Sequence, residues 1–307
     1  MDSLKNNIMD DTVVITAETG TFPYSNFENY LSIPLADRRK QDRRAPDRRS
    51  TQSRNLKKIS VLIPCYNEEK GIGKVIDDIP LKKLAHFGYQ TEIIVIDNNS
   101  HDNTIKVARE KGAKIVTEKR QGKGNALKTG FRNISHDTDY IVMLDGDNTY
   151  KSTEILRLIE PLENDFCEVV IGSRLEGKMN GTSLSLSHRM ANWFFTFFVR
   201  SFYLVNTTDT CTGYFAWKKK VIDELICHIK SDGFAIEAEM ITKMAKLGYK
   251  IFSVPITYDL REGNSKLSPI IDGIKITWML IKNLFWKPEE EVTQNLAPIL
   301  TEEKLSG

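Results

Sequence analysis

Two aspartates separated by one glycine are the residues of this sequence most clearly suited to chemistry. The apolar run 140–144 (YIVML) is typical of a buried strand, and Asp145 and Asp147 follow it directly. The carboxyl ends of parallel strands are where α/β proteins bind ligands. Two carboxylates placed there repel each other and lose hydration, so a cation must offset their charge. Mg²⁺ or Mn²⁺ shared with a diphosphate would do so, and a solvated Asp-Gly turn is the alternative.

Polar residues also follow two earlier predicted strands. The run 58–64 leads into Tyr66, and the run 92–97 ends in Asp97. In this fold class an acid at the end of a strand often binds the polar edge of a nucleotide, although it can also cap a turn. Because parallel strands end at one edge of a sheet, we expect Tyr66, Asp97 and Asp145 to lie along that edge.

A glycine-rich turn opens the helix predicted to run through about residue 131. It contains Gly122, Lys123 and Gly124, and it follows a third predicted strand at 113–117. The spacing is not that of a Walker motif. Two glycines before a helix still let the backbone approach a diphosphate, with the Lys123 ammonium nearby. Strands that alternate with helices predict an α/β fold, with a mostly parallel sheet flanked by helices.

Four of these motifs together resemble those of family-2 glycosyltransferases: VLIPCYNEE (61–69), VIDNNSHDNT (95–104), GKGNALKTGF (122–131) and VMLDGDNTY (142–150). Three later motifs look like those of the polyprenyl-phosphate glycosyltransferases, the group that contains dolichol-phosphate mannose synthase: VVIGSRLEG (169–177), TDTCTGYFAWKK (208–219) and REGNSKL (261–267). The resemblance covers about residues 57–285.

The resemblance implies a GT-A (Rossmann-like) fold and an inverting transfer of a hexose from a nucleotide sugar to a polyprenyl or dolichyl phosphate. It implies that Asp145 and Asp147 serve a Mg²⁺ or Mn²⁺ ion and the diphosphate. The residues that it brings to the nucleoside are Pro64, Tyr66, Glu68 and Asp97. The cations that it brings to the donor diphosphate and the acceptor phosphate are Arg174, Arg189, Arg261 and Lys266.

Two positions depart from the family pattern. The family usually has a second acid after the one at Asp97, and this chain has Asn98 there. Mannose synthases often have Gln two positions beyond the second metal acid, where this chain has Thr149. The donor therefore stays open between GDP-mannose and a UDP-linked sugar such as UDP-glucose or UDP-N-acetylglucosamine.

The need for a catalytic base distinguishes a phosphate acceptor from a hydroxyl acceptor, and the sequence favours the phosphate. A phosphate is already anionic at neutral pH and needs little help from a base, whereas a sugar hydroxyl needs one. Many hydroxyl-directed relatives supply it from a Glu-Asp pair, and this sequence has no Glu-Asp dipeptide. Glu237 and Glu239 are candidates for a base, with a structural role as the alternative. A soluble or glycan hydroxyl acceptor and a non-catalytic nucleotide-sugar-binding protein are the rival interpretations.

Composition predicts one large domain in a reducing compartment. The chain has 307 residues, of which 40% are hydrophobic, enough for a sizeable core. Its four cysteines lack CxxC spacing, which favours free thiols. Residues 1–36 show no signal-peptide pattern, and no apolar run reaches the length of a membrane span. We expect a cytoplasmic enzyme that is peripheral to the cytosolic face of a membrane.

Four segments are expected: a disordered arm (1–56), the GT-A catalytic domain (57–267), an amphipathic helix (268–287) and a loose polar tail (288–307). The arm repeats Asp-Arg-Arg three times, so it is either a solvated linker or a basic arm for an anionic membrane surface. No nucleic-acid module accompanies it, and nucleic acid is not an expected partner.

The expected helix carries an apolar stripe made of Ile271, Ile274, Trp278, Ile281 and Phe285. Core packing and binding at a membrane interface, with Lys275 and Lys282 at the boundary, both explain such a stripe. The aromatic stretch 191–205 is too short to span a membrane. The interfacial helix, the basic arm or a partner membrane protein would bring the enzyme to its lipid acceptor.

Overall fold

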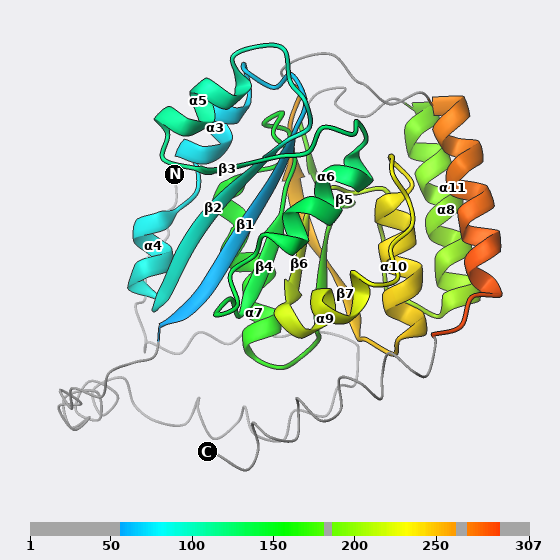
Figure 1. Ribbon diagram of the computed structural model, residues 1–307. Helices are drawn as coiled ribbons and strands as arrows, with labels where there is room; N and C mark the ends of the chain where they lie inside the picture. Colours follow the sequence, from blue (N-terminus) through cyan, green and yellow to red (C-terminus); the bar gives the residue numbers. More distant parts are fainter. Residues whose placement is uncertain (1–55, 181–185, 262–268, 289–307) are drawn as a thin grey trace, which may run out of the picture. The chain divides into compact units, whose positions relative to one another are not determined.

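The computed structural model describes residues 56–180, 186–261 and 269–288 (Figure 1). The basic repeats of the arm, the side chain of Lys266 and the tail from residue 289 lie outside these residues. Predictions made for those segments therefore stay predictions.

The described part of the chain forms one seven-stranded sheet in the order β3-β2-β1-β4-β6-β5-β7. The strands are β1 (Lys57–Cys65), β2 (Tyr89–Asp97), β3 (Lys114–Thr117), β4 (Tyr140–Met143), β5 (Val169–Met179), β6 (Phe215–Lys218) and β7 (Ile251–Tyr258). Neighbours pair in parallel except for β6, which is antiparallel to both β4 and β5. The predicted α/β fold with a mostly parallel sheet is confirmed.

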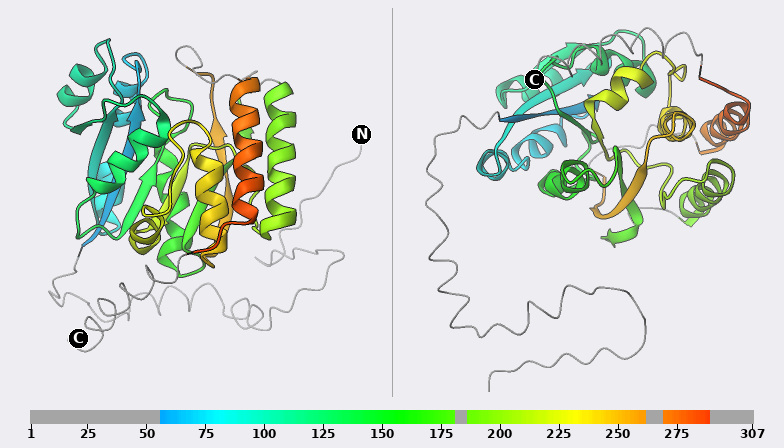
Figure 2. Two further views of the ribbon diagram at one scale, coloured as in Figure 1. Left: turned by 45° about the vertical axis from the view of Figure 1, so that its right-hand side comes forward. Right: turned by 90° about the horizontal axis from the view of Figure 1, so that it is seen from below.

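Helices cover both faces of the sheet (Figure 2). One face carries α3 (Ile72–Asp77), α4 (Leu81–His86), α5 (Thr104–Glu110) and α7 (Ile155–Glu163), which follows the short 3-10 helix η1 (Ser152–Glu154). The other face carries α6 (Lys123–Arg132), α8 (Leu186–Tyr203), α9 (Lys219–Leu225), α10 (Ile236–Lys246) and α11 (Pro269–Leu284).

Alternation along the central strand explains the two cores. In β1, Leu62 packs into the core under α6 and α10, whereas Val61 and Ile63 pack into the core under α3 and α7. Successive side chains of a strand point to opposite faces, so a continuous apolar run fills both layers.

The strand register brings the polar strand ends together. In the parallel pairs, Cys65 lies opposite Asp97, and Leu62 lies opposite Met143. The segments that follow β1, β2 and β4 therefore leave the sheet at the same edge, as the sequence predicted.

Several elements were not predicted from the sequence, among them β6 and α8. The short strand β6 lies within the motif 208–219, and the aromatic stretch 191–205 falls largely within the long helix α8. Helices α8 and α11 lie side by side, and the Tyr203 hydroxyl donates a hydrogen bond to the Leu280 carbonyl (2.5 Å). Within the described ranges, no helix combines the length and apolar character needed to cross a membrane.

Candidate active site

A cavity of ≈ 370 Å³ opens at the carboxyl edge of the central strands. Its lining includes these residues predicted from the sequence: Pro64, Tyr66, Glu68, Lys123, Asp145, Asp147 and Arg261. The lining is completed by Cys65, Asn98, Gln121, Gly122, Ala126, Gly146 and Phe234. Segments almost two hundred residues apart in the sequence thus meet in one cavity.

Asp147 is the most constrained acid of the cavity. It is 3% exposed, and its Oδ1 accepts hydrogen bonds from the Thr149 backbone N–H (3.1 Å) and the Thr149 hydroxyl (2.6 Å). Its Oδ2 lies 3.2 Å from Nη1 of Arg261. Burial raises the pKa of Asp147, the nearby charge of Asp145 raises it further, and Arg261 and Thr149 oppose this rise.

Arg261 bridges two acids from distant parts of the chain. Its Nη2 donates to Oε1 of Glu68 (2.9 Å), while Nη1 faces Asp147. Burial would lower the pKa of Arg261, but the charges of Asp147 and Glu68 outweigh burial and raise it. The guanidinium therefore stays charged in the cavity lining. Its planar N–H groups can bind two phosphate oxygens at once.

Lys123 makes a second bridge deeper in the site. Its Nζ lies 2.6 Å from Oδ1 of Asp145 and 2.6 Å from Oε1 of Glu237. Burial would lower the pKa of Lys123, but the two carboxylates outweigh burial and hold the pKa above its ordinary value. One ammonium cannot fully compensate two acids, and burial leaves the pKa of Glu237 raised as well.

The donor set fits a hard divalent ion. Asp145 and Asp147 present carboxylate oxygens, which are the ligands that Mg²⁺ and Mn²⁺ prefer. Each carboxylate already attracts a basic side chain, Lys123 in one case and Arg261 in the other, so this position draws positive charge. No cluster of three or more His, Cys, Asp or Glu that could hold a metal occurs among the described residues. Two carboxylates suffice where phosphate oxygens and water complete the coordination.

Two predicted site residues, Asp97 and Arg174, are not among the residues that line the cavity. Asp97 is buried, and its carboxylate lies 3.3 Å from the backbone N–H of Ser100 in its own turn. The buried Arg174 forms a two-point ion pair with Asp209 (Nε to Oδ2 2.7 Å, Nη2 to Oδ1 2.8 Å). It also donates to the Cys211 carbonyl at 2.6 Å. Their roles toward nucleoside and phosphate remain predictions that this geometry does not support directly.

The remaining two predicted cations cannot be placed in the cavity either. Arg189 is exposed in the first turns of α8 and is not part of the lining, and Lys266 lies outside the described residues. Their roles toward the phosphates stay predictions.

Several residues of the cavity lining were not assigned to it from the sequence, and Asn98 and Phe234 are two of them. Asn98 lines the cavity, and the signal that could have identified it was its position directly after a strand end. Phe234 enters from the loop between α9 and α10, for which the sequence carries no comparable signal. Glu237 was predicted as a candidate base, with a structural role as the alternative, and in the structure it is a buried partner of Lys123.

Comparison with known proteins places these motifs in a family. Residues 60–226 match the family described as Glycosyl transferase family 2. The chain is 33% identical over 220 residues to Glycosyltransferase AglJ of Haloferax volcanii, covering 70% of this chain and 68% of that protein.

Two further relatives have names that specify a lipid phosphate. Dolichyl-phosphate hexose transferase of Haloferax volcanii is 28% identical over 224 residues, with 73% of this chain and 92% of that protein covered. Undecaprenyl-phosphate mannosyltransferase of Micrococcus luteus is 29% identical over 231 residues, with 70% and 90% covered.

The fold also resembles solved structures. Glucosyl-3-phosphoglycerate synthase from Mycobacterium tuberculosis, in complex with Mn²⁺, uridine diphosphate and glucosyl-3-phosphoglycerate, superposes with a TM-score of 0.57 at 23% identity. The match covers 76% of this chain and 81% of that one. This likeness is one of fold, and it agrees with the GT-A type that the motifs predicted.

Proposed function

This chain belongs to glycosyl transferase family 2, and on that premise we propose that it transfers a hexose from a nucleotide sugar to a polyprenyl phosphate. The observation that carries the proposal is the meeting of Asp145, Asp147, Lys123 and Arg261 in one cavity. Acids that hold a cation and bases that bind phosphate are both needed where a nucleotide diphosphate is the leaving group.

The donor would lie across the carboxyl edge of the sheet. Pro64, near the end of β1, and Tyr66 and Glu68, just after it, line the cavity, and the resemblance assigns these residues to the nucleoside. Lys123 and Arg261 would donate hydrogen bonds to diphosphate oxygens, exchanging some of their present carboxylate partners for them. A Mg²⁺ or Mn²⁺ ion held by Asp145 and Asp147 would supply additional positive charge to the leaving diphosphate.

The chemistry is a single displacement that inverts the anomeric carbon. An oxygen of the acceptor phosphate attacks that carbon, and the bond to the nucleotide diphosphate breaks as the new bond forms. Because the attacking oxygen is already anionic, no residue has to take a proton from it. The two lipid-phosphate relatives and the absence of a Glu-Asp dipeptide both support a phosphate acceptor.

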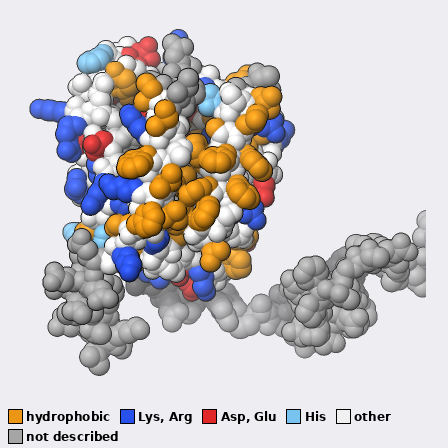
Figure 3. Space-filling model, turned by 90° about the vertical axis from the view of Figure 1, so that its right-hand side faces the viewer, with side chains coloured by type: hydrophobic (Ala, Val, Ile, Leu, Met, Phe, Trp, Pro, Cys, Tyr) orange, Lys and Arg blue, Asp and Glu red, His pale blue; other side chains and the backbone are white. Residues whose placement is uncertain are grey.

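An exposed apolar surface supports a lipid-linked acceptor. A polyprenyl chain cannot leave a bilayer cheaply, since each CH₂ brought into water costs about 0.8 kcal/mol. We define the α8–α11 face by its exposed residues: Leu186, Met190, Trp193 and Phe197 on α8, with Ile271, Ile274, Trp278, Ile281 and Phe285 on or just after α11. Figure 3 shows hydrophobic side chains gathered across this side of the molecule, with basic side chains along its margin.

Ordinary core packing does not account for this face. In α11 the inward side chains of Ile276, Met279 and Leu280 are buried, while Trp278 on the outer side is 68% exposed. A helix with large apolar side chains on both its inner and its outer side is normally covered on both of those sides. We propose that the bilayer covers the outer side, with Lys275 and Lys282 near anionic headgroups at the cytosolic face.

A panel of donors tests the proposed function. GDP-mannose, UDP-glucose and UDP-N-acetylglucosamine would each be incubated with the protein, polyprenyl phosphate in vesicles, and Mg²⁺ or Mn²⁺. We expect one donor to give a lipid whose mass has increased by one sugar residue, and chelator to abolish that product. Transfer to a soluble glycan with no lipid product from any donor would contradict the proposal.

A further inference from the structure

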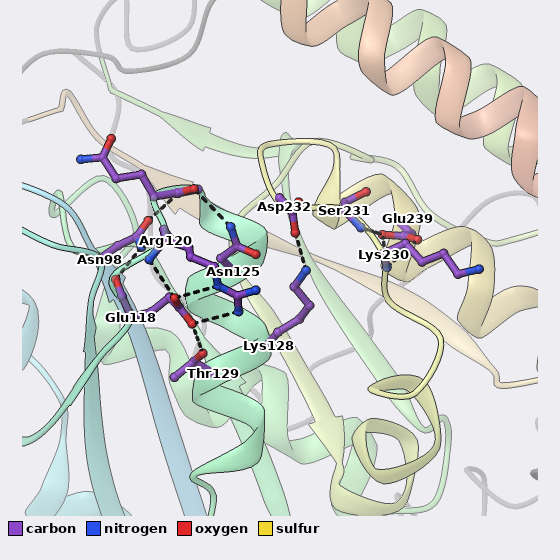
Figure 4. A network of polar contacts seen from close by, with 12 residues as sticks. Asn98, Glu118, Arg120, Asn125, Lys128, Thr129, Lys230, Ser231, Asp232 and Glu239 are labelled. Carbon is purple, nitrogen blue, oxygen red and sulfur yellow. Dashed lines mark hydrogen bonds and ion pairs between the residues drawn. The ribbon is translucent and has the colours of Figure 1, made fainter.

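We propose that Asn98 and Glu239 are positioning residues that clamp the glycine-rich turn 121–125 from two sides and thereby hold Lys123 in the cavity. The inference rests on the proposed function, because Lys123 is assigned there to the donor diphosphate. Figure 4 shows both sides of the clamp around the start of α6.

The first side of the clamp is a single amide group. Asn98 is 5% exposed, and its Nδ2 donates to the carbonyls of Glu118 (3.0 Å) and Arg120 (2.8 Å). Its Oδ1 accepts the backbone N–H of Gly122 (2.7 Å). This pattern needs two donors and one acceptor on the same planar group, which Asn supplies and an ionised Asp cannot. The departure from the family's second acid thus has a local structural reason.

The second side of the clamp is the segment 230–234, which leads into α10. A Cβ at Gly122 would lie 2.1 Å from the Asp232 carbonyl oxygen, and one at Gly124 would lie 2.2 Å from the Ser231 carbonyl oxygen. Only glycine permits this approach, and Gly122 also has a φ of 129°. The Asn125 backbone N–H donates to the Asp232 carbonyl (3.2 Å), so the segment is bonded to the turn as well as packed on it.

Glu239, on α10, anchors the first residues of this segment through its carboxylate. Its carboxylate is 2% exposed and accepts the backbone N–H groups of Lys230 (3.1 Å) and Ser231 (2.7 Å). The buried Lys243, one turn further along α10, lies 2.5 Å from the same carboxylate. A buried carboxylate with three donors is held rigidly, and the segment that it anchors is held with it.

The clamp affects the site because the clamped turn carries Lys123. Lys123 is the residue between the two tightly packed glycines, and its ammonium reaches Asp145 and Glu237. A lysine side chain has four flexible bonds, so only a fixed backbone gives the ammonium one position. Glu237 and Glu239 are two residues apart on α10. The same helix therefore supplies both the carboxylate that anchors segment 230–234 and the carboxylate that pairs with Lys123.

Two conservative variants test the clamp, each with a matched control. Asn98→Asp removes the two amide donors, and its control is Asn133→Asp, whose amide bonds one carbonyl at the far end of α6. Glu239→Gln removes the charge, and its control is Glu163→Gln, which removes another ion-paired carboxylate. Affinity for UDP and for GDP, each with Mn²⁺, would be measured by calorimetry on the full chain. Acetylation of the Lys123 amine would be measured by peptide mass against the exposed Lys83.

We expect Asn98→Asp and Glu239→Gln to weaken nucleotide binding by about tenfold or more, the value of one charge-assisted hydrogen bond. We also expect Lys123 acetylation to rise severalfold relative to Lys83, while each control stays within about twofold of wild type. A merely structural role would lower the amount of folded protein but leave the Lys123 reactivity of the folded fraction unchanged.

The outcomes separate this inference from the proposed function. Wild-type reactivity of Lys123 and wild-type affinity in both clamp variants would overturn the clamp. Failure of the wild type to bind either nucleotide would count against the proposed function, and the acetylation measurement would still decide the clamp. If Glu239→Gln alone does not fold because Lys243 has lost its partner, Glu239→Gln combined with Lys243→Met restores charge balance and is measured in its place.

Discussion

At the residue scale, acidic side chains outnumber basic ones among the described residues of the site. Four acids (Glu68, Asp145, Asp147 and Glu237) share two basic side chains, Lys123 and Arg261. Within the described ranges, this set therefore has an excess of carboxylates over basic side chains. Such an excess is costly in the ligand-free protein, and a divalent cation would neutralise it. The same arrangement would let both basic side chains turn to phosphate oxygens when the donor arrives.

Replacing Asp147 by Asn separates stability from activity. We expect the product yield to fall by about 100-fold or more because the cation site loses a carboxylate. The ligand-free variant should unfold at a temperature no lower than wild type, because burial and the charge of Asp145 disfavour the ionised carboxylate.

The pH dependence of that stability has a definite sign. The pKa of Asp147 in the folded protein lies above its value of 3.8 in the unfolded chain, so the folded state binds the proton more readily. Stability contributed by this group therefore rises as the pH falls through the folded-state pKa, and the Asn variant lacks that rise. Thermal unfolding of the Asn variant and of wild type, measured at a series of pH values falling from neutral, would show the difference. Near-normal, chelator-resistant turnover in the Asn variant would contradict the assigned role.

Only part of the site could be predicted from single residues. Asp145, Asp147 and Tyr66 were predicted because each stands just after a buried strand, and strand ends meet at one edge, whereas Glu68 was predicted only from the family resemblance. Arg174 also follows buried residues of a strand, but its guanidinium is bound by Asp209, which is 35 positions away. Whether a side chain faces the cavity or a distant partner depends on tertiary contacts, and local spacing does not encode them.

At the element scale, the parallel strands were predictable and the antiparallel strand was not. β1 and β2 each contain a continuous apolar run (VLIP and IIVI), β4 consists of one (YIVM), and such runs are typical of strands with both faces covered by helices. β6 has only four residues (FAWK), and it follows polar threonines and a glycine that gave no strand signal. Helix α8 was missed because its aromatic residues occur on both its buried and exposed sides, which obscures the helical period.

The exposed α8–α11 face gives an element-scale prediction. The double variant Trp278→Glu with Ile281→Glu should lower binding to anionic liposomes by about tenfold or more, since two apolar side chains leave the interface. Both side chains are exposed, so the variant should fold normally and bind nucleotide like wild type. Liposome sedimentation at low and high salt measures the effect.

A matched control uses exposed apolar residues elsewhere. Leu81→Glu with Phe87→Glu changes the same number of exposed apolar residues at α4, on the other side of the sheet. Liposome binding should be unaffected in this control. Equal losses in the two double variants, or unfolding of the α11 variant, would show that the α8–α11 face has another role.

At the scale of the whole molecule, one helix joins the cavity to the exposed face. α10 carries Glu237, which binds Lys123, and it packs against α11, where Asn283 donates to the Thr242 hydroxyl (2.9 Å). Arg261 lines the cavity only eight positions before α11 begins. A membrane-seated α11 would therefore present the cavity at a fixed height above the lipid phosphates, which suits an acceptor that stays in the bilayer.

The most direct test of the account compares two acceptors that differ only in the phosphate. Vesicles would contain either a polyprenyl phosphate or the corresponding polyprenol, and the wild-type protein would receive its best nucleotide-sugar donor with Mn²⁺. Lipid products would be measured by mass over time. We expect a glycosylated polyprenyl phosphate, no glycosylated polyprenol, and loss of the product with chelator. Equal transfer to the polyprenol, or transfer that chelator does not affect, would contradict it.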